Sequence, residues 1–228
     1  MPDFADIKAV IFDMDGLLLD SERVSLTTFI ESCRAYGFEP DIKVYYKCIG
    51  TNSDGTKAVL TRGYGPDFPY DAIAALWHAK FHEEVLSKPI PLKNGALDLL
   101  KYLEAESIRK AVVTSTRCED AVKMLSNADL LGFFEFVLGG DQIKNGKPDP
   151  EIYMTGCSKL GVQPAFCLAL EDSDNGVLAA FNAGMSIIQV PDLIVPSERV
   201  KPLGHRIVGS LFEVEKLLRL RGWEAKAR

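Results

Sequence analysis

Short apolar runs recur along the chain, and segments in which apolar residues have helical spacing separate them. The first run, Ala9–Asp13, opens with four apolar residues in a row, which is typical of a strand buried on both faces of a parallel sheet. Similar runs predict strands at Lys110–Ser115, Phe136–Leu138, Cys167–Glu171, Ser186–Val190 and Arg206–Val208. Helical spacing predicts helices at Gly95–Ala105, Cys118–Ala128, Pro150–Leu160, Asn175–Ala183 and Leu211–Arg219. This alternation predicts the α/β class with a doubly wound parallel sheet.

Residues 20–91 interrupt the alternation. They contain no convincing strand, and their helical patterns lie at Glu22–Tyr36, Ala58–Gly63 and Tyr70–Leu86. Pro89 and Pro91 follow the last pattern, and prolines this close together disfavour helix and stiffen a connection. We therefore interpret residues 20–91 as an inserted helical domain, and residues 1–19 and 92–228 as the α/β core.

Composition excludes several classes of partner. The 228 residues carry a net charge of −6, so we expect no broad basic surface for nucleic acid or for an anionic membrane. No apolar run approaches the length of a membrane span. The five cysteines form no C-x-x-C pair and are odd in number, which favours reduced thiols and a cytoplasmic protein over a disulfide framework.

Two carboxylates, Asp13 and Asp15, stand at the end of the first predicted strand, and Gly16 follows them. Burying an ionised carboxylate is costly unless a cation or hydrogen-bond donors compensate it. In open α/β sheets, ligands bind outside the carboxyl ends of the strands, which is where both acids are expected. The pair therefore indicates a bound metal or a transferred proton.

Three further polar clusters follow predicted strands. The second strand ends in the hydroxyl residues Thr114, Ser115 and Thr116, and a helix follows; hydroxyls and the free amides of a helix start can bind phosphate oxygens. Lys147 precedes a proline-containing turn and could neutralise a phosphoryl group. Glu171 and Asp172 end another strand and provide oxygen ligands that suit Mg²⁺.

Each cluster also has a structural interpretation. Ser115 could cap a helix, Lys147 could be a solvated surface lysine, and Glu171 with Asp172 could favour the positive end of the following helix. The two acids after the first strand are harder to explain in this way, because a purely structural sheet gains nothing from them. Four such clusters in one α/β chain favour a functional site over four separate structural roles.

Taken together, these residues resemble the motifs of the haloacid dehalogenase-like hydrolases. The similarity is to the branch that contains β-phosphoglucomutase and small sugar-phosphate phosphatases, close to its pseudouridine 5′-phosphatase-like members. The run Asp13–Glu22 matches the first motif, Ser115 the second, Lys147 the third and Glu171–Asp172 the fourth. The match covers nearly the whole chain, and this branch carries a helical cap inserted after its first motif.

The resemblance implies a mechanism and a ligand set. Asp13 would attack phosphorus and form an aspartyl-phosphate, and Asp15 would act as general acid and then as general base. Mg²⁺ would bind to the Asp13 carboxylate, the Asp15 backbone carbonyl and Asp172, with support from Glu171. The phosphoryl oxygens would contact Ser115, the Thr116 amide and Lys147. A monomer that acts on a small phosphorylated metabolite is the default for this branch.

Relatives with other activities differ at identifiable positions. Dehalogenases and phosphonate hydrolases of this fold lack the second aspartate, which is Asp15 here. Mutases of the branch carry a histidine in the first cap helix and an arginine in the cap loop, where our alignment places Ser25 and Ser53. We therefore expect an Mg²⁺-dependent phosphomonoesterase acting on a phosphorylated sugar or nucleoside. A phosphosugar mutase is the alternative, and a non-catalytic binding module is a weaker one.

Substrate choice is expected to rest with the inserted domain. The polar segment Gly50–Thr56 is interpreted as a loop between helices, and its residues Thr51, Asn52 and Ser53 are candidates for substrate contact. An ordinary turn, with Ser53 or Asp54 capping the next helix, is the alternative. Asp20 begins the inserted domain and is a candidate hinge or specificity residue.

Overall fold

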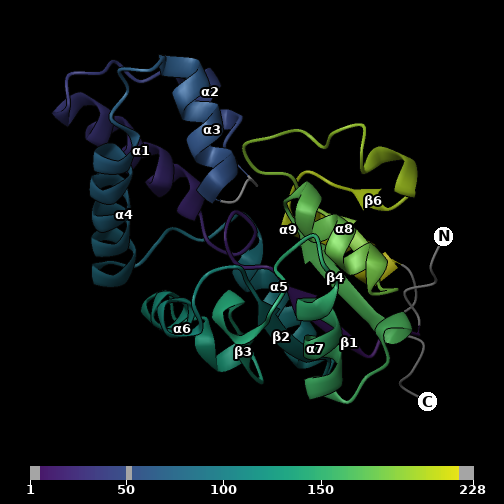
Figure 1. Ribbon diagram of the computed structural model, residues 1–228. Coiled ribbons are helices and arrows are strands. Elements are labelled where there is room, and N and C mark those ends of the chain that lie inside the picture. The colour runs from purple at the N-terminus through teal and green to yellow at the C-terminus, as the bar shows by residue number, and fades with distance from the viewer. Residues whose placement is uncertain (1–5, 50–52, 221–228) are drawn as a thin grey trace. The chain divides into compact units, whose positions relative to one another are not determined.

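The computed structural model describes residues 6–49 and 53–220. Six strands form one sheet in the order β3-β2-β1-β4-β5-β6, and every neighbouring pair is parallel (Figure 1). The strands are β1 (Ala9–Phe12), β2 (Arg109–Val113), β3 (Val137–Leu138), β4 (Cys167–Glu171), β5 (Ser186–Gln189) and β6 (Arg206–Ile207). The predicted α/β class and doubly wound parallel sheet are confirmed.

The strand order determines where a ligand site can form. The chain runs from β1 outward through β2 to β3, and then returns to build β4, β5 and β6 on the other side. The direction of winding therefore reverses between β1 and β4, and ligands of such sheets bind at the carboxyl ends of the strands at this switch point. Phe12, the last residue of β1, is in register with Val112 of β2 and with Leu170 of β4. The residue that follows Phe12 is thus flanked by both neighbouring strands.

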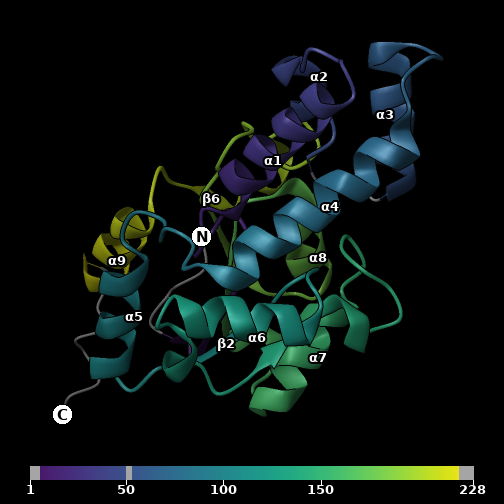
Figure 2. The same cartoon turned by 90° about the vertical axis from the view of Figure 1, so that its left-hand side faces the viewer.

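Helices cover the sheet and bury its apolar side chains. The helix α7 packs against β1 and β2, and α8 packs against β4 and β5. Helices α5 and α9 pack against each other (Figure 2). The helices of this part are α5 (Ala96–Ala105), α6 (Cys118–Asn127), α7 (Glu151–Leu160), α8 (Asp174–Asn182) and α9 (Leu211–Leu220). The five helices predicted for the core are therefore present, with ends within two residues of those predicted.

The chain divides into two compact units, Met1–Asp20 with Ile90–Arg228, and Ser21–Pro89. The first is the α/β unit and the second is a helical unit. The helical unit contains α1 (Ser21–Ala35), α2 (Ile42–Tyr46), α3 (Ser53–Tyr64) and α4 (Tyr70–Ser87). Its core is aromatic, with the rings of Phe29, Tyr45 and Trp77 5.1 to 5.8 Å apart. None of the helices in the described ranges is both long and apolar enough to cross a bilayer.

Two details of the helical unit differ from the sequence predictions. Helix α2 was not predicted. It is capped by Asp41, whose side chain accepts a hydrogen bond from the backbone N–H of Lys43 at 2.8 Å. The loop predicted for Gly50–Thr56 is wrong from Ser53 onward, because α3 begins there. Serine and aspartate are typical of helix starts, which explains why this polar segment belongs to a first helical turn.

Candidate active site

The carboxylates predicted to end β1 and β4 lie close together. Asp13 directly follows β1, its backbone N–H donates to the Leu170 carbonyl of β4, and its side chain is buried. Ligand oxygens of Asp13, Glu171 and Asp172 all lie within 4.8 Å of one another. Gly16 turns the chain away with a φ of +74°, and a Cβ at this position would lie 2.5 Å from Oδ2 of Asp172. Glycine at position 16 therefore leaves the space that the Asp172 carboxylate occupies.

Lys147 joins two of these acids. Its Nζ lies 2.5 Å from Oδ1 of Asp13 and 2.5 Å from Oε1 of Glu171, and only 6% of the lysine side chain is exposed. The interpretation of Lys147 as a solvated surface lysine is therefore wrong. Its loop is fixed by Glu151 at the start of α7, whose carboxylate accepts hydrogen bonds from the backbone N–H groups of Lys144 and Asn145, each at 2.8 Å.

Glu171 is surrounded by hydrogen-bond donors. Oε1 accepts from Lys147 and, at 2.6 Å, from the Tyr153 hydroxyl, while Oε2 accepts from the backbone N–H and the hydroxyl of Ser173. A carboxylate has about four acceptor sites, so these four contacts use its capacity. A Cβ on Gly176 would overlap Cδ and both carboxylate oxygens of Glu171, so only glycine leaves room for this side chain. Tyr153 was not predicted, because in sequence it is one more apolar residue of a helix.

The charges of the site are unbalanced. Burial, together with Glu171 and Asp15, raises the pKa of Asp13 to about 8, although Lys147 acts in the opposite direction. Burial alone would lower the pKa of Lys147, but Asp13 and Glu171 outweigh it and raise the pKa above its ordinary value. Lys147 therefore stays charged. A second cation beside Asp13 would lower the pKa of that carboxyl and favour its ionised form.

The donor set fits a magnesium ion. The clustered side chains offer carboxylate oxygens, which are hard ligands, and Mg²⁺ typically binds one or two protein carboxylates and keeps several waters. Since the Glu171 oxygens are already occupied by donors, Asp13 and Asp172 are the carboxylates suited to direct contact with the ion. The predicted contact through the Asp15 backbone carbonyl stays a prediction.

Two side chains of the segment that follows β2 are hydrogen-bonded to the Asp15 carboxylate. The hydroxyls of Thr114 and Thr116 both donate to Oδ2 of Asp15, at 3.2 and 2.8 Å. The Thr116 backbone N–H, expected to hold phosphate, donates to Oγ1 of Thr114 at 3.1 Å. Ser115 lies between them and is exposed, and its carbonyl oxygen would lie 2.5 Å from a Cβ on Gly140. Sequence reasoning missed the contacts of the two threonines with Asp15, because nothing in their spacing separates them from helix caps.

The residues predicted to determine substrate specificity are Asp20, Thr51, Asn52 and Ser53. Asp20 lies where two connecting segments of the α/β unit run side by side: its N–H donates to the Pro91 carbonyl, and Lys93 approaches its carboxylate at 3.6 Å. Thr51 and Asn52 lie outside the described residues, and Ser53 is the first residue of α3. Their predicted contacts with substrate stay predictions.

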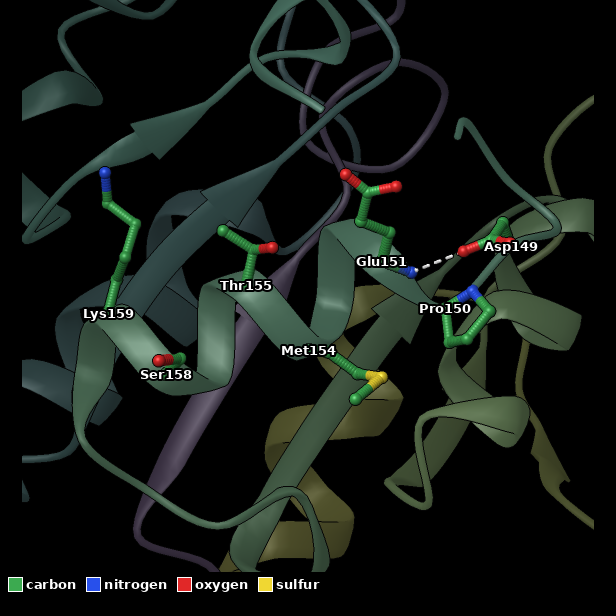
Figure 3. A pocket seen from close by; sticks show the side chains of 7 residues that line it. All are labelled: Asp149, Pro150, Glu151, Met154, Thr155, Ser158 and Lys159. Atoms are coloured by element: carbon green, nitrogen blue, oxygen red, sulfur yellow. Dashed lines mark hydrogen bonds between the residues drawn. The ribbon is translucent and has the colours of Figure 1, made fainter. Parts of the chain in front are cut away.

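An open pocket on the outer side of α7 is lined by residues other than the predicted site residues (Figure 3). Glu151 links it to the candidate site, because this residue fixes the loop before Lys147 and its own N–H donates to the Asp149 carboxylate at 3.0 Å. The pocket is lined by Asp149, Pro150, Glu151, Met154, Thr155, Ser158 and Lys159. None of the predicted site residues is among these seven.

Comparison with known proteins identifies the family. The model of the family described as "Haloacid dehalogenase-like hydrolase" matches residues 10–190, which include Asp13, Lys147 and Asp172. The chain belongs to the haloacid dehalogenase-like hydrolases. The predicted resemblance is thereby confirmed, and the chain is an enzyme.

Individual relatives support this assignment. The chain is 32% identical over 185 residues to a phosphorylated carbohydrates phosphatase of Thermotoga maritima, covering 80% of this chain and 84% of that protein. It is 30% identical over 195 residues to a protein of Drosophila melanogaster named as a pseudouridine-5′-phosphatase, covering 83% of this chain and 84% of that protein. The crystal structure of CbbY from Rhodobacter sphaeroides in complex with phosphate superposes with a TM-score of 0.73 at 28% identity, over 91% of this chain and 96% of that one.

Proposed function

We propose that this haloacid dehalogenase-like hydrolase is an Mg²⁺-dependent phosphomonoesterase that acts on a small phosphorylated sugar or nucleoside. The observation that carries the proposal is the buried Asp13 carboxylate, held 2.5 Å from Lys147 and within 4.8 Å of the ligand oxygens of Asp172. A carboxylate that is buried but paired with cations is suited to attack an electrophile that is itself anionic. The similarity to curated phosphatases supports phosphorus as that electrophile.

Asp13 attacks the phosphorus atom and forms an aspartyl-phosphate while the bond to the leaving oxygen breaks. Asp15 gives its proton to that oxygen and later takes a proton from the water that hydrolyses the acyl phosphate. The hydroxyls of Thr114 and Thr116 fix Oδ2 of Asp15, so that this side chain keeps one orientation through both steps.

Positive charge at the phosphoryl group comes from two sources. Lys147 neutralises part of the charge on the transferred group, and Glu171 with Tyr153 keeps the lysine in place. Mg²⁺, when bound to Asp13 and Asp172, supplies further positive charge that allows a phosphate dianion to approach the Asp13 carboxylate. Ser115 is exposed shortly after β2 and is a candidate to hold a phosphoryl oxygen.

A phosphatase is favoured over a mutase by the residues of the helical unit. At the position where mutases of this family carry a histidine, this chain has Ser25 in α1. The carbonyl of Ser25 accepts from Nε1 of Trp77 at 3.0 Å, and its hydroxyl is hydrogen-bonded to Tyr45. Serine at this position contacts two residues of the aromatic core, Trp77 and Tyr45, and offers no imidazole for proton transfer.

The test is phosphate release from a panel of phosphorylated metabolites with and without Mg²⁺. The wild type is compared with Asp13→Asn, and Asp98→Asn, an exposed aspartate in the first turn of α5, is the matched control. We expect release only with Mg²⁺, by the wild type and the control. Because nucleophile removal is expected to lower kcat by roughly 10³-fold or more, near-normal turnover by Asp13→Asn would overturn the mechanism.

The panel also decides between the two activities. It includes β-glucose 1-phosphate with a glucose 1,6-bisphosphate primer, and glucose 6-phosphate is measured beside free phosphate. Glucose 6-phosphate without phosphate release would establish a mutase. Neither product from any substrate would overturn the proposed phosphomonoesterase activity.

A further inference from the structure

A buried glutamine lies directly beside the carboxylates of the site. Gln189 is the last residue of β5, is in register with Glu171 and is only 1% exposed. Its Nε2 donates to the backbone carbonyl of Asp172 at 3.2 Å and approaches Oδ1 of Asp174 at 3.4 Å. Its Oε1 lies 2.8 Å from Nε2 of His205, which precedes β6. Gln189 thus contacts the backbone of Asp172. Any influence of Gln189 on the position of the Asp172 carboxylate is exerted through the backbone.

The chemistry of these contacts fixes the direction of every hydrogen bond. The carbonyl of Asp172 and the carboxylate of Asp174 are acceptors, so the NH₂ group of Gln189 must face them. Its carbonyl oxygen therefore faces His205, and Nε2 of His205 must carry a proton and donate it. The other ring nitrogen, Nδ1, is buried and has no partner among the described residues, which is consistent with its being the unprotonated one. Burial also lowers the pKa of His205, which favours the neutral ring.

The loop from Asp172 to Asp174 is held from two further points. The Asp174 carboxylate accepts from the backbone N–H of Ser197 at 3.2 Å, and the N–H of Val190 donates to the Glu171 carbonyl at 2.7 Å. With its own carbonyl bound to Gln189, Asp172 has little freedom to rotate about its backbone. Gly16 leaves a space of limited size for the side chain. The backbone of Asp172 is therefore held by groups outside the predicted set of metal ligands.

We propose that Gln189, oriented by His205, is a positioning residue that holds Asp172 for magnesium binding. This inference rests on the proposed function and identifies residues outside the four motifs that carried it. Groups that orient metal ligands typically contribute a factor of about 10 to 100 to metal affinity. The role of the pair is to set Mg²⁺ affinity, and substrate binding at saturating metal does not depend on it.

The variant Gln189→Met tests this, because it keeps the length of the side chain and removes both the donor and the acceptor. We expect the Kd for Mg²⁺, measured by calorimetric titration of the metal-free protein, to rise about tenfold or more. In steady-state assays at saturating Mg²⁺, KM for the best substrate is expected to stay within about twofold of the wild type. Gln163→Met, at an exposed glutamine before the 3₁₀ turn Pro164–Phe166, is the matched control.

His205 provides a second and independent variant. His205→Phe keeps a planar ring and removes the donor to Gln189, so it is expected to weaken Mg²⁺ binding in the same direction. His205→Gln retains an N–H donor and is expected to restore a Kd close to that of the wild type. If Gln189→Met does not fold, as judged by circular dichroism, the two His205 variants decide the question.

The outcomes separate this inference from the function on which it rests. A wild type that neither binds Mg²⁺ nor releases phosphate would overturn the proposed function. A wild type that does both, with folded Gln189→Met and His205→Phe proteins that bind Mg²⁺ equally well, would overturn only the positioning role. A lower melting temperature with an unchanged Kd would show that the pair serves stability alone.

Discussion

The interiors of the two units differ in kind. In the α/β unit, β1, β2, β4 and β5 bury an apolar core, but the site end of the sheet also buries Asp13, Glu171 and Gln189. The helical unit buries an aromatic cluster, and its buried polar residues other than tyrosine and cysteine are hydroxyls: Ser21, Thr28 and Ser32. Among the described residues, every buried charged side chain lies in the α/β unit. Buried charge is thus confined to the unit whose sheet offers a ligand site, where Lys110 of β2 is buried in addition to Asp13 and Glu171.

This contrast predicts which property a substitution in each unit should change. Charges at the site are costly to bury, so their retention is explained by chemistry and not by stability. The aromatic cluster is explained by burial and ring packing alone. Variants in the first region should lose activity or metal binding at modest cost in stability, and variants in the second should do the reverse.

The largest effect on stability is expected for Phe29→Ala. The Phe29 ring is fully buried and lies 5.1 Å from both Tyr45 and Trp77. Its truncation is expected to lower the free energy of unfolding of the helical unit by about 3–5 kcal/mol. Hydrogen exchange would show faster exchange of amides in α1 and α4 with little change in β1 and β4, and the Kd for Mg²⁺ would stay that of the wild type.

A tenfold change in Mg²⁺ affinity in folded Phe29→Ala protein would break the comparison, because the aromatic core would then influence the carboxylates. Leu26→Ala in the same helix provides the control. Leu26 is only partly buried against the same cluster, so its truncation is expected to cost less.

A smaller effect on stability and a large effect on activity are expected for Gly176→Ala. The added Cβ would overlap the Glu171 carboxylate, so that carboxylate must move and Lys147 loses one of its two partners. Overpacking of this kind costs about 1–3 kcal/mol in the free energy of unfolding. We expect phosphate release to fall by about 10²-fold or more, as when a preorganised charge is displaced.

Gly132→Ala is the matched control for this change. Gly132 lies in a 3₁₀ turn, and a Cβ there would meet no atom within 4 Å. The two variants add the same methyl group, so the control should keep both stability and turnover. Equal activity of the two alanine variants would show that the position of Glu171 does not matter for the reaction.

The same contrast explains what could be predicted from sequence. The strands of the α/β unit are short, apolar and unbroken, and their carboxyl ends are marked by Asp13, Thr114 and Glu171, so their location was predictable. The short helix α2 and the start of α3 were not, because one capping residue, Asp41, and a polar first turn resemble a loop. Local pattern is informative where a segment is buried on all sides, and much less so where one capping contact determines the structure.

For the site, sequence reasoning supplied the charged groups and missed the groups that orient them. Asp13, Glu171 and Asp172 stand at strand ends and Lys147 lies in the loop before α7, and the structure brings these four motif residues together. The contacts of Tyr153, Gln189 and His205 are made by side chains from other elements that converge only in the folded chain. Such contacts depend on strand order and register, which a single sequence does not contain.

The smallest effect concerns the pH dependence of stability. Burial lowers the pKa of His205 below its ordinary value of 6.5, and Asp174 on α8 acts in the opposite direction. Just below pH 6.5 the folded protein therefore binds fewer protons at this residue than the unfolded chain does. The contribution of His205 to stability is full above pH 6.5 and is lost as the pH falls through the lowered pKa. The wild type should accordingly lose more unfolding free energy between about pH 7.5 and about pH 5.5 than His205→Gln.

The control applies the same substitution in the other unit. His78 is exposed on α4, and His78→Gln makes the same change of side chain at the surface of that unit. Denaturant titrations of the three metal-free proteins at several pH values give the comparison. If His205→Gln follows the wild type at every pH, then His205 is free to take up a proton in the folded protein. The neutral ring inferred for His205 would then be wrong, although its Nε2 would still donate to Oε1 of Gln189.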